Sequence, residues 1–307
     1  MQPLIKNNLK IMKVFKFFLS GILMLVFFNI AISAQENPDT SYWKLGGLGS
    51  LALSQVSLTN WAAGGENSFS GNILANGNAN YLRDKTSWEN MLVLGYGLMK
   101  QGSLGVRKTD DRIDFASKYG RYAFKHWYYS GMFRFNTQFA NGYAYPNDEV
   151  AISKFMAPGY INLAVGMDYK PSENFTLFIG PVSGKVTFVL DDSLSHYKAF
   201  GVDMDKKVRN EFGGLIKSMY TREVVKNVTF LTRLDLFSNY LKNPEKIDVN
   251  WEVLFNMKIN KYLSASLNTL LIWDDDIKFN SEGLLDPTGK SKVQFKEVFG
   301  IGLSATF

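Results

Sequence analysis

The stretch from Val293 to Phe307 constrains the fold of this chain more than any other. From Phe299 to Phe307 every second residue is apolar, and small or weakly polar residues lie between them. This period of two is typical of a β-strand with one apolar face. A strand this regular would template aggregation if its edge stayed open. In a closed barrel the last strand pairs with the first, so we expect the apolar face and the terminal aromatic ring to contact a bilayer.

The rest of the chain repeats this alternation in segments separated by connections that are short and long in turn. The segments are long enough for tilted spanning strands, which need about 9 to 11 residues. We expect strands at residues 45–58, 69–82, 88–100, 113–124, 127–140, 160–170, 175–190, 212–225, 228–240, 247–259, 262–274 and 293–307. The short connections then share one side with both termini. The sequence thus predicts an all-β fold, a closed antiparallel up-and-down transmembrane β-barrel of about twelve strands.

Soluble all-β folds agree less well with this pattern. A propeller needs blades that repeat at a fixed period, and none is visible. A sandwich would use strands of about 5 to 6 residues. A soluble barrel with an apolar interior has the same periodicity, so loop asymmetry and an export signal must decide against it.

Residues 1–34 have the order of features of a secretory signal peptide. Scattered lysines precede an apolar run that extends from Phe17 to Ile32, and Ser33 and Ala34 follow it. A membrane anchor is the weaker alternative, because a spanning helix needs about 20 apolar residues. Translation could begin at Met1 or at Met12. We expect export to the cell outer membrane, with residues 35–307 forming the barrel domain.

Composition excludes several classes of function. Four of the lysines behind the formal charge of +6 lie in the signal segment, so no basic face for nucleic acid is expected. The chain has no cysteine, which excludes disulfides and thiolate chemistry. Acidic runs such as Asp274 to Asp276 lack the spacing of a calcium-binding EF-hand. No metal and no cofactor are therefore expected.

The alternation also assigns charged side chains to the inside of the barrel. A lysine or arginine that faces lipid at mid-depth costs about 2 to 4 kcal/mol, so Arg233 and Asp235 must point inward. The residues expected to line the lumen are Arg134, Asn136, Gln138, Asn162, Asp168, Lys185, Arg233, Asp235, Asn239, Asp248, Asn250, Glu252 and Lys258. Charges of both signs allow a hydrophilic pore or a cross-linked, plugged interior, and they indicate no ion selectivity.

The longest predicted loops are residues 141–159 and 191–209. The first contains the apolar side chains Val150, Ile152, Phe155 and Met156, which are unfavourable in a bare surface loop. Packing into the barrel mouth would bury them and constrict the lumen. Alternatively, the loop covers the rim against neighbouring loops or a partner.

Hydrolytic chemistry would need a serine, a histidine and an orienting carboxylate or amide. The two histidines are His126, at a predicted turn, and His196, in a polar loop beside Ser195. Adjacent residues do not readily form the contact between a nucleophile and its base. We therefore expect no enzyme, and an outer-membrane lipase is the alternative.

Short pieces throughout the chain resemble a domain-of-unknown-function family of outer-membrane barrel proteins from Bacteroidota. They are Trp61-Ala62-Ala63-Gly64-Gly65, Lys118-Tyr119-Gly120, Phe135-Asn136-Thr137-Gln138-Phe139, Ala157-Pro158-Gly159-Tyr160, Leu234-Asp235-Leu236-Phe237-Ser238-Asn239-Tyr240 and Lys258-Ile259-Asn260-Lys261-Tyr262. The resemblance covers essentially the whole chain after the signal. It implies the fold and the compartment, and no established activity or catalytic residue.

Two functional hypotheses remain open at this point. One is a small-solute channel with a loop-constricted polar lumen. The other is a structural or assembly barrel with a salt-bridged, plugged interior that binds lipopolysaccharide or a partner protein. Either would contact outer-membrane lipid, periplasmic chaperones and the barrel-assembly machinery, and the oligomeric state is open.

Overall fold

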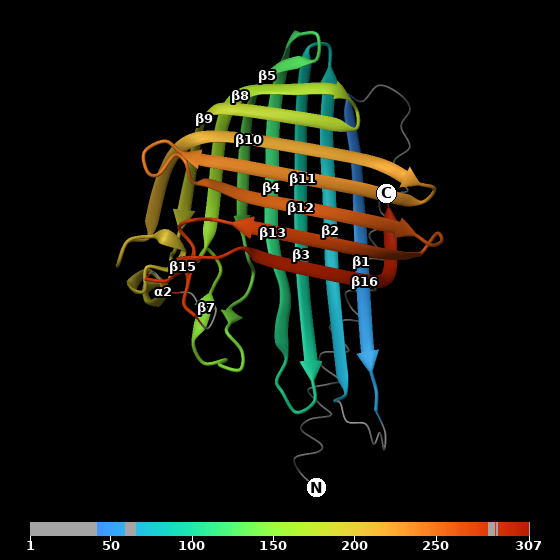
Figure 1. The fold of residues 1–307 in the computed structure, drawn as a ribbon. Coiled ribbons are helices and arrows are strands. Elements are labelled where there is room, and N and C mark those ends of the chain that lie inside the picture. Colours follow the sequence, from blue (N-terminus) through green and yellow to red (C-terminus); the bar gives the residue numbers. More distant parts are fainter. Residues whose placement is uncertain (1–41, 59–65, 282–285, 287, 307) are drawn as a thin grey trace.

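The computed structural model describes residues 42–58, 66–281, 286 and 288–306. Twelve strands form a closed antiparallel barrel, in which each strand pairs with the next one along the chain (Figure 1). The strands are β1 (Trp43–Val56), β2 (Ser68–Arg83), β3 (Thr86–Gln101), β4 (Arg107–Phe124), β5 (Trp127–Thr137), β8 (Gly159–Ser172), β9 (Phe175–Phe188), β10 (Val208–Val225), β11 (Val228–Asn239), β12 (Ile247–Lys258), β13 (Leu263–Trp273) and β16 (Gln294–Thr306). Leu48 of β1 lies opposite Thr306 of β16, and this pairing closes the barrel. The predicted fold class is confirmed.

The connections are short at one end of the barrel and long at the other. The long ones carry small elements of their own, which gather at that end in Figure 1. These are the ribbon of β6 (Gly142–Tyr143) and β7 (Ala151–Ser153), the helices α2 (Asp192–His196) and η1 (Ala199–Gly201), and the ribbon of β14 (Lys278–Phe279) and β15 (Lys290–Ser291). No helix in the described part of the chain is long and apolar enough to cross a membrane.

Two strands start four or more residues earlier than the sequence predicts. β4 begins at Arg107, within the polar stretch 101–112 that was expected to be a loop, and β10 begins at Val208, within the expected loop 191–209. The polar residues at the start of β4 themselves alternate, because Asp110 and Arg112 face the interior, where they pair with Lys296 of β16 and Glu252 of β12. A polar interior therefore hides the start of a strand from hydrophobic patterning.

β9 carries a bulge at Pro181. Gly180 lies opposite Leu215 of β10 and Ser183 lies opposite Gly213, so two residues of β9 face one residue of β10. Proline has no backbone N–H for the ladder, and a bulge is where a strand tolerates it.

The two faces of the barrel wall differ in chemistry. Residues directly opposite each other on paired antiparallel strands share a face. Leu234 lies opposite Trp251, whose side chain is exposed outside, whereas Arg233 lies opposite Glu252, whose side chain is buried inside. Further exposed apolar side chains cover the outside, among them Tyr129, Leu163, Val165, Phe299 and Ile301. Residues 1–34, the piece 61–65 and Phe307 lie outside the described residues, so the predicted signal peptide and terminal aromatic stay predictions.

Candidate functional site: the barrel interior and its mouth

Charged side chains inside the barrel form three layers along its axis. The turn-side layer comprises Glu89, Lys118, Asp168 and Lys170. The central layer comprises Arg112, Asp114, Arg134, Lys217, Arg233, Asp235 and Glu252. The loop-side layer comprises Lys185, Arg209, Glu211, Asp248, Asp274 and Asp276. In each layer, cations and carboxylates from different strands are close enough to neutralise each other.

Asp114 is the anchor of the central layer and is fully buried, with 0% of its surface exposed. Arg134 binds it with two hydrogen bonds, from Nε to Oδ1 at 3.0 Å and from Nη2 to Oδ2 at 2.7 Å. Arg112 donates to the same Oδ2 from Nη2 at 3.1 Å. Such bidentate arginine–carboxylate pairs have fixed geometry and are stronger than neutral hydrogen bonds.

The central layer also spans the lumen. Arg112 of β4 donates from Nη1 to Oε1 of Glu252 on β12 at 3.2 Å. These two strands are directly opposite, since five strands separate them in either direction around the barrel. Arg134 of β5 likewise reaches Asp235 of β11 at 2.6 Å, with three strands between them. Side chains from opposite walls thus meet at mid-height.

Apolar side chains fill the interior beside the central layer. Met132, Ala164, Phe178, Leu215 and Phe237, from the consecutive strands β5, β8, β9, β10 and β11, form one buried cluster. Barrels of eight strands are filled by side chains, while those of 16 to 18 strands leave an aqueous channel. With twelve strands, this barrel is small enough for ion pairs and an apolar cluster to bridge its interior.

The turn-side layer ties β3, β4 and β8 together. Lys118 lies 2.6 Å from Oδ2 of Asp168 and 3.2 Å from Oε2 of Glu89. Lys170 pairs with the same two carboxylates. Asp168 is fully buried, so its charge depends on these two ammonium groups.

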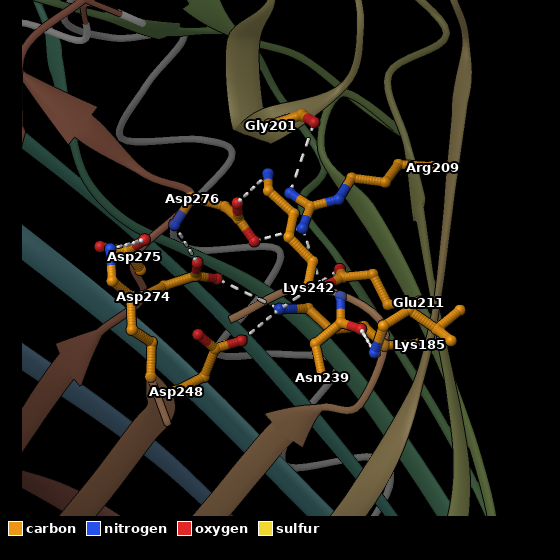
Figure 2. Close-up of polar contacts among 12 residues, drawn as sticks. Lys185, Gly201, Arg209, Glu211, Asn239, Lys242, Asp248, Asp274, Asp275 and Asp276 are labelled. Atoms are coloured by element: carbon orange, nitrogen blue, oxygen red, sulfur yellow. Dashed lines mark hydrogen bonds and ion pairs between the residues drawn. The ribbon is translucent and has the colours of Figure 1, made fainter. Parts of the chain in front are cut away.

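The loop-side layer attaches a long connection to the barrel wall (Figure 2). Lys185 of β9 lies 2.9 Å from Asp248 of β12 and 3.1 Å from Asp274, which follows β13. Arg209 of β10 pairs with Glu211 at 2.9 Å and with Asp276. The connection between β13 and β16 is therefore held by cations from β10 and β9, which two and three strands separate from β13.

Asp276 of this connection forms two ion pairs, with Arg209 and with Lys242. Burial raises its pKa, but the hydrogen bond and charge of Arg209, together with Lys242, outweigh this effect and leave the pKa below its ordinary value. Arg209 also donates to the carbonyl oxygen of Gly201 at 3.4 Å. Gly201 has a φ of 75°, and a Cβ there would lie 2.2 Å from Nη1 of Arg209. Glycine is thus needed both for the backbone conformation and for the close approach of the guanidinium.

The structure places most of the predicted lumen-lining residues inside the barrel. Asp168, Lys185, Arg134, Arg233, Asp235, Asp248 and Glu252 belong to the three layers, and Asn239 donates to Glu211 at 3.2 Å. By register, Asn162 lies opposite Arg134, Asn136 opposite Asp114, and Asn250 opposite Asp235, so these three share the inner face. Lys258 is exposed at the turn end, and Gln138 lies beyond the end of β5, where it donates to Ala140. Whether these residues line a path for solutes stays a prediction.

The predicted constriction loop does not bury its apolar side chains as expected. Val150, Ile152 and Phe155 are exposed and Met156 is half-buried. The loop instead forms the β6–β7 ribbon, and Val150 and Ile152 border a cavity shared with the α2–η1 connection. Packing into the barrel mouth would have buried these side chains, and it is not seen for the three that are exposed. A constricting role for the loop stays a prediction.

Sequence reasoning missed several members of the layers. Arg112, Lys118, Lys170, Arg209, Glu211 and Lys217 were not among the expected lumen residues. Arg112 and Arg209 were missed because the predicted strands begin after them, at residues 113 and 212. Their signal was present, since Asp110, Arg112 and Asp114 continue the two-residue period of β4.

Ser195 and His196 have separate partners. The Ser195 hydroxyl donates to the carbonyl oxygen of Asp192 at 3.0 Å and is buried. Nδ1 of the exposed His196 ring lies 2.9 Å from Asp205. His126 contacts the ring of Tyr169 at a turn. These contacts differ from the linked serine, histidine and carboxylate of a hydrolase triad.

Comparisons with known proteins identify no activity for this chain. A family model described as a protein of unknown function (DUF3078) matches residues 53–143. No curated protein matches the chain. The Bacteroidota lineage implied by the sequence resemblance stays a prediction.

Several solved structures are similar over most of their length. An outer membrane channel from Pseudomonas putida F1 is 10% identical, with 89% of this chain and 98% of that chain covered and a TM-score of 0.38. The translocator domain of the autotransporter NalP from Neisseria meningitidis is 8% identical, with 94% and 96% covered and a TM-score of 0.37. OmpT, an outer membrane protein of Vibrio cholerae, is 8% identical, with 89% and 100% covered and a TM-score of 0.30. At these scores the fold rests on the strand pairing of this chain itself.

Proposed function

We propose that this protein is an outer-membrane β-barrel whose interior ion pairs close the lumen, and that it acts as a structural or assembly barrel. The reversed polarity of the wall supports the membrane location, because exposed apolar side chains cover the outside while charges lie inside. At the turn end the ring of Trp43 also packs in a tilted arrangement against Tyr81 and Trp88, with centroids 5.3 and 5.6 Å away. Aromatic residues at this depth are typical of a membrane interface.

The ion pair between Arg112 and Glu252 is the main observation in support of a closed lumen. It joins opposite strands at mid-height, and Glu252 also binds Arg233 and accepts a hydrogen bond from Asn268 at 3.0 Å. A solute that crossed here would have to break buried charge-assisted contacts. Breaking a buried pair costs about 3 to 5 kcal/mol, so steady conduction is not expected.

The binding role is supported by the long-loop end. Several apolar side chains at this end are exposed, including Val150, Phe155, Tyr197, Met204 and Leu241. Exposed apolar patches mark contacts with other molecules, and the proposed occupants are lipopolysaccharide or a partner protein. On the opposite side of the membrane, export and folding would depend on periplasmic chaperones and the barrel-assembly machinery.

Conductance in planar bilayers tests the closed lumen. We expect purified wild-type protein to be silent and the double variant Arg112→Ala/Glu252→Ala to conduct, since it removes the pair that spans the lumen. The matched control is Lys242→Ala, whose charge lies at the rim and is 62% exposed. Regular stepwise conductance of wild-type protein would contradict the proposal.

A small-solute channel is the second candidate, and the charged layers at both ends of the interior favour it. In that case the central layer would act as a gate. Wild-type protein would then show small steps, and replacing residues 150–156 by a Gly/Ser linker would enlarge them if this loop narrows the mouth. An unchanged step size would show that this loop does not narrow the conduction path.

Membrane location has its own test. Folded barrels in detergent migrate differently from boiled ones in gel electrophoresis, and we expect this heat-modifiable mobility. Solubility without detergent, together with identical migration, would contradict an outer-membrane barrel.

A further inference from the structure

The end of the barrel with the short turns carries many more cations than carboxylates. In the described part of the chain, nine lysines and arginines are exposed at this end, against three exposed carboxylates. The cations are Lys44, Arg83, Lys85, Arg121, Lys125, Arg222, Lys226, Lys258 and Lys261, and the carboxylates are Asp84, Glu173 and Glu223. The turn-side layer adds two lysines and two carboxylates, which pair with each other. The turn end therefore has an excess of six positive charges, nine less three.

The nine exposed cations form a ring around the barrel, which we call the basic ring. Lys44 lies at the start of β1, and the turns β2–β3, β4–β5, β10–β11 and β12–β13 contribute two cations each. Within the described residues, the ion pair of Arg83 with Asp84, at 3.6 Å, is the only one that the basic ring forms. A ring of charge fits a surface that surrounds the barrel, such as a lipid leaflet, better than it fits a protein docked on one side.

Two arginines of the basic ring lie on the outer face of the wall. Arg121 lies opposite Tyr129, whose ring is exposed outside, so the two residues share this face. Thr86 lies opposite Arg121 on one side and opposite Arg83 on the other, which places both arginines in one row. Both of their side chains are exposed. The outer surface at this row is therefore cationic.

Exposed aromatic side chains lie next to this row, farther from the turns. Trp88 of β3 lies opposite Tyr119 of β4, two residues from Thr86 and from Arg121 along the strands. Both rings are exposed on the outer face. Arg222 of β10 also faces outward, because it lies opposite Phe230, which lies opposite Phe255 on the outer face of β12. Aromatic rings at the interface, followed by cations, are the order expected where a wall passes from hydrocarbon into lipid headgroups.

We propose that the basic ring binds the headgroup phosphates of anionic glycerophospholipids. An arginine that faces lipid is costly at mid-depth and is tolerated near the interface, so Arg83, Arg121 and Arg222 mark the depth of the headgroups. Guanidinium groups bind phosphate oxygens with charge-assisted hydrogen bonds, and anionic lipid surfaces attract lysines and arginines. The short turns of such barrels face the periplasm, so the lipids belong to the periplasmic leaflet. The inference rests on the proposed membrane location and names the lipid class that this end selects.

Tryptophan fluorescence can measure this selection, because Trp43, Trp88 and Trp127 lie at the turn end. Full-length protein would be folded into vesicles of one fixed mixture of phosphatidylcholine and phosphatidylglycerol, in which only one of the two lipids is brominated. Bromine quenches the tryptophans that its lipid contacts. We expect phosphatidylglycerol to contact the protein about two- to fivefold more often than its share of the mixture, the range of one exposed ion pair. Added NaCl should reduce this preference by screening.

Variants locate the preference on the barrel. The triple variant Arg83→Gln/Arg121→Gln/Arg222→Gln should bring the contact ratio of the two lipids close to one. Removal of three lysines at the turn tips, by Lys125→Gln/Lys226→Gln/Lys261→Gln, should lower the ratio as well, so the test stands even if the arginine variant does not fold. The matched control is Lys198→Gln/Lys206→Gln/Lys290→Gln, which removes three exposed lysines from the long connections and should leave the ratio unchanged. Heat-modifiable mobility shows which variants fold.

The outcomes separate this inference from the membrane location itself. Quenching by neither lipid would contradict the membrane location. Equal quenching by the two lipids would leave the location intact and overturn the lipid preference, and an acidic partner protein would then be the better candidate for the basic ring. An equal decrease of the ratio in the turn-end variants and in the control would also overturn the proposal, because net charge alone would then explain the preference.

Discussion

The central layer and the rim of the mouth use the same kinds of ion pair in different surroundings. Asp114 in the central layer is fully buried and is held by two arginines, whereas Lys242 at the rim is 62% exposed and shares Asp276 with Arg209. An exposed pair is screened and worth at most about 1 kcal/mol. Removing one partner of a buried pair leaves an uncompensated charge and is strongly destabilising. The depth of an ion pair, and not the number of ion pairs, should therefore decide how much a substitution lowers the free energy of unfolding.

The largest expected effect is at Asp114. Asp114→Asn keeps the shape of the side chain but leaves Arg134 and Arg112 without their shared anion, and breaking such a buried pair costs about 3 to 5 kcal/mol. Urea unfolding in lipid vesicles, followed by tryptophan fluorescence, would measure the loss. The matched control is Asp84→Asn at a turn, where the carboxylate is exposed and lies 3.6 Å from Arg83. A loss at Asp114 as small as that at Asp84 would show that depth does not matter.

The next effect compares the two faces of one strand. Val253 of β12 lies opposite Thr232 on the outer face, and Asn250 lies opposite Asp235 on the inner face. Val253→Arg places a charge against lipid, at a cost of about 2 to 4 kcal/mol, whereas Asn250→Arg adds a cation beside a carboxylate. We expect only the first to impair folding into vesicles, as measured by the folded fraction on gels. Equal impairment would mean that the assigned faces are wrong.

This comparison shows how far the sequence predicts the barrel. Alternation is a local property, and it placed Arg233 and Asp235 on the inner face correctly because a wall that faces lipid excludes charge. Barrel closure followed from the regular last strand, Gln294–Thr306, which has to pair with another strand. Both features depend on neighbours along one strand or across one ladder.

The pairing across the lumen could not be predicted in this way. That Arg112 meets Glu252 depends on the diameter of the barrel, the tilt of its strands and the relative height of two residues far apart in sequence. The charged residues that alternate at the start of β4 also resemble the sequence of a polar loop. For this reason Arg112 was not assigned to a strand. The structure of the long connections was harder still to predict. The α2–η1 connection, for example, is organised by a few specific contacts, such as the hydrogen bond that the Asp191 side chain accepts from the backbone N–H of Leu194.

Acid should weaken the ion pairs of Asp276 at the mouth of the barrel. The pKa of Asp276 is held below its ordinary value by Arg209 and Lys242 despite the opposing effect of burial. For a lowered pKa, the stabilisation is complete above the ordinary value and is lost as the pH falls through the folded-state value. Amide hydrogen exchange of residues 274–279, corrected for intrinsic rates, should therefore accelerate below about pH 4, the ordinary range of aspartate. Asp276→Asn should exchange faster at neutral pH and lose this pH dependence, and a wild-type profile that stays flat down to pH 2 would contradict the assignment.

The smallest expected effect is at Lys242, which makes it the sharpest test of the comparison. Its ammonium lies 3.2 Å from Oδ1 of Asp276, a distance similar to those in the central layer. Because the side chain is mostly exposed and Asp276 keeps Arg209, Lys242→Ala should lower the free energy of unfolding by at most about 1 kcal/mol. The same urea titration in vesicles measures it, and raising the salt should reduce the difference between the variant and wild type further, since exposed pairs are screened. If Lys242→Ala cost as much as Asp114→Asn, the ion pairs would act as one cooperative network from the rim to the centre, and depth would not separate them.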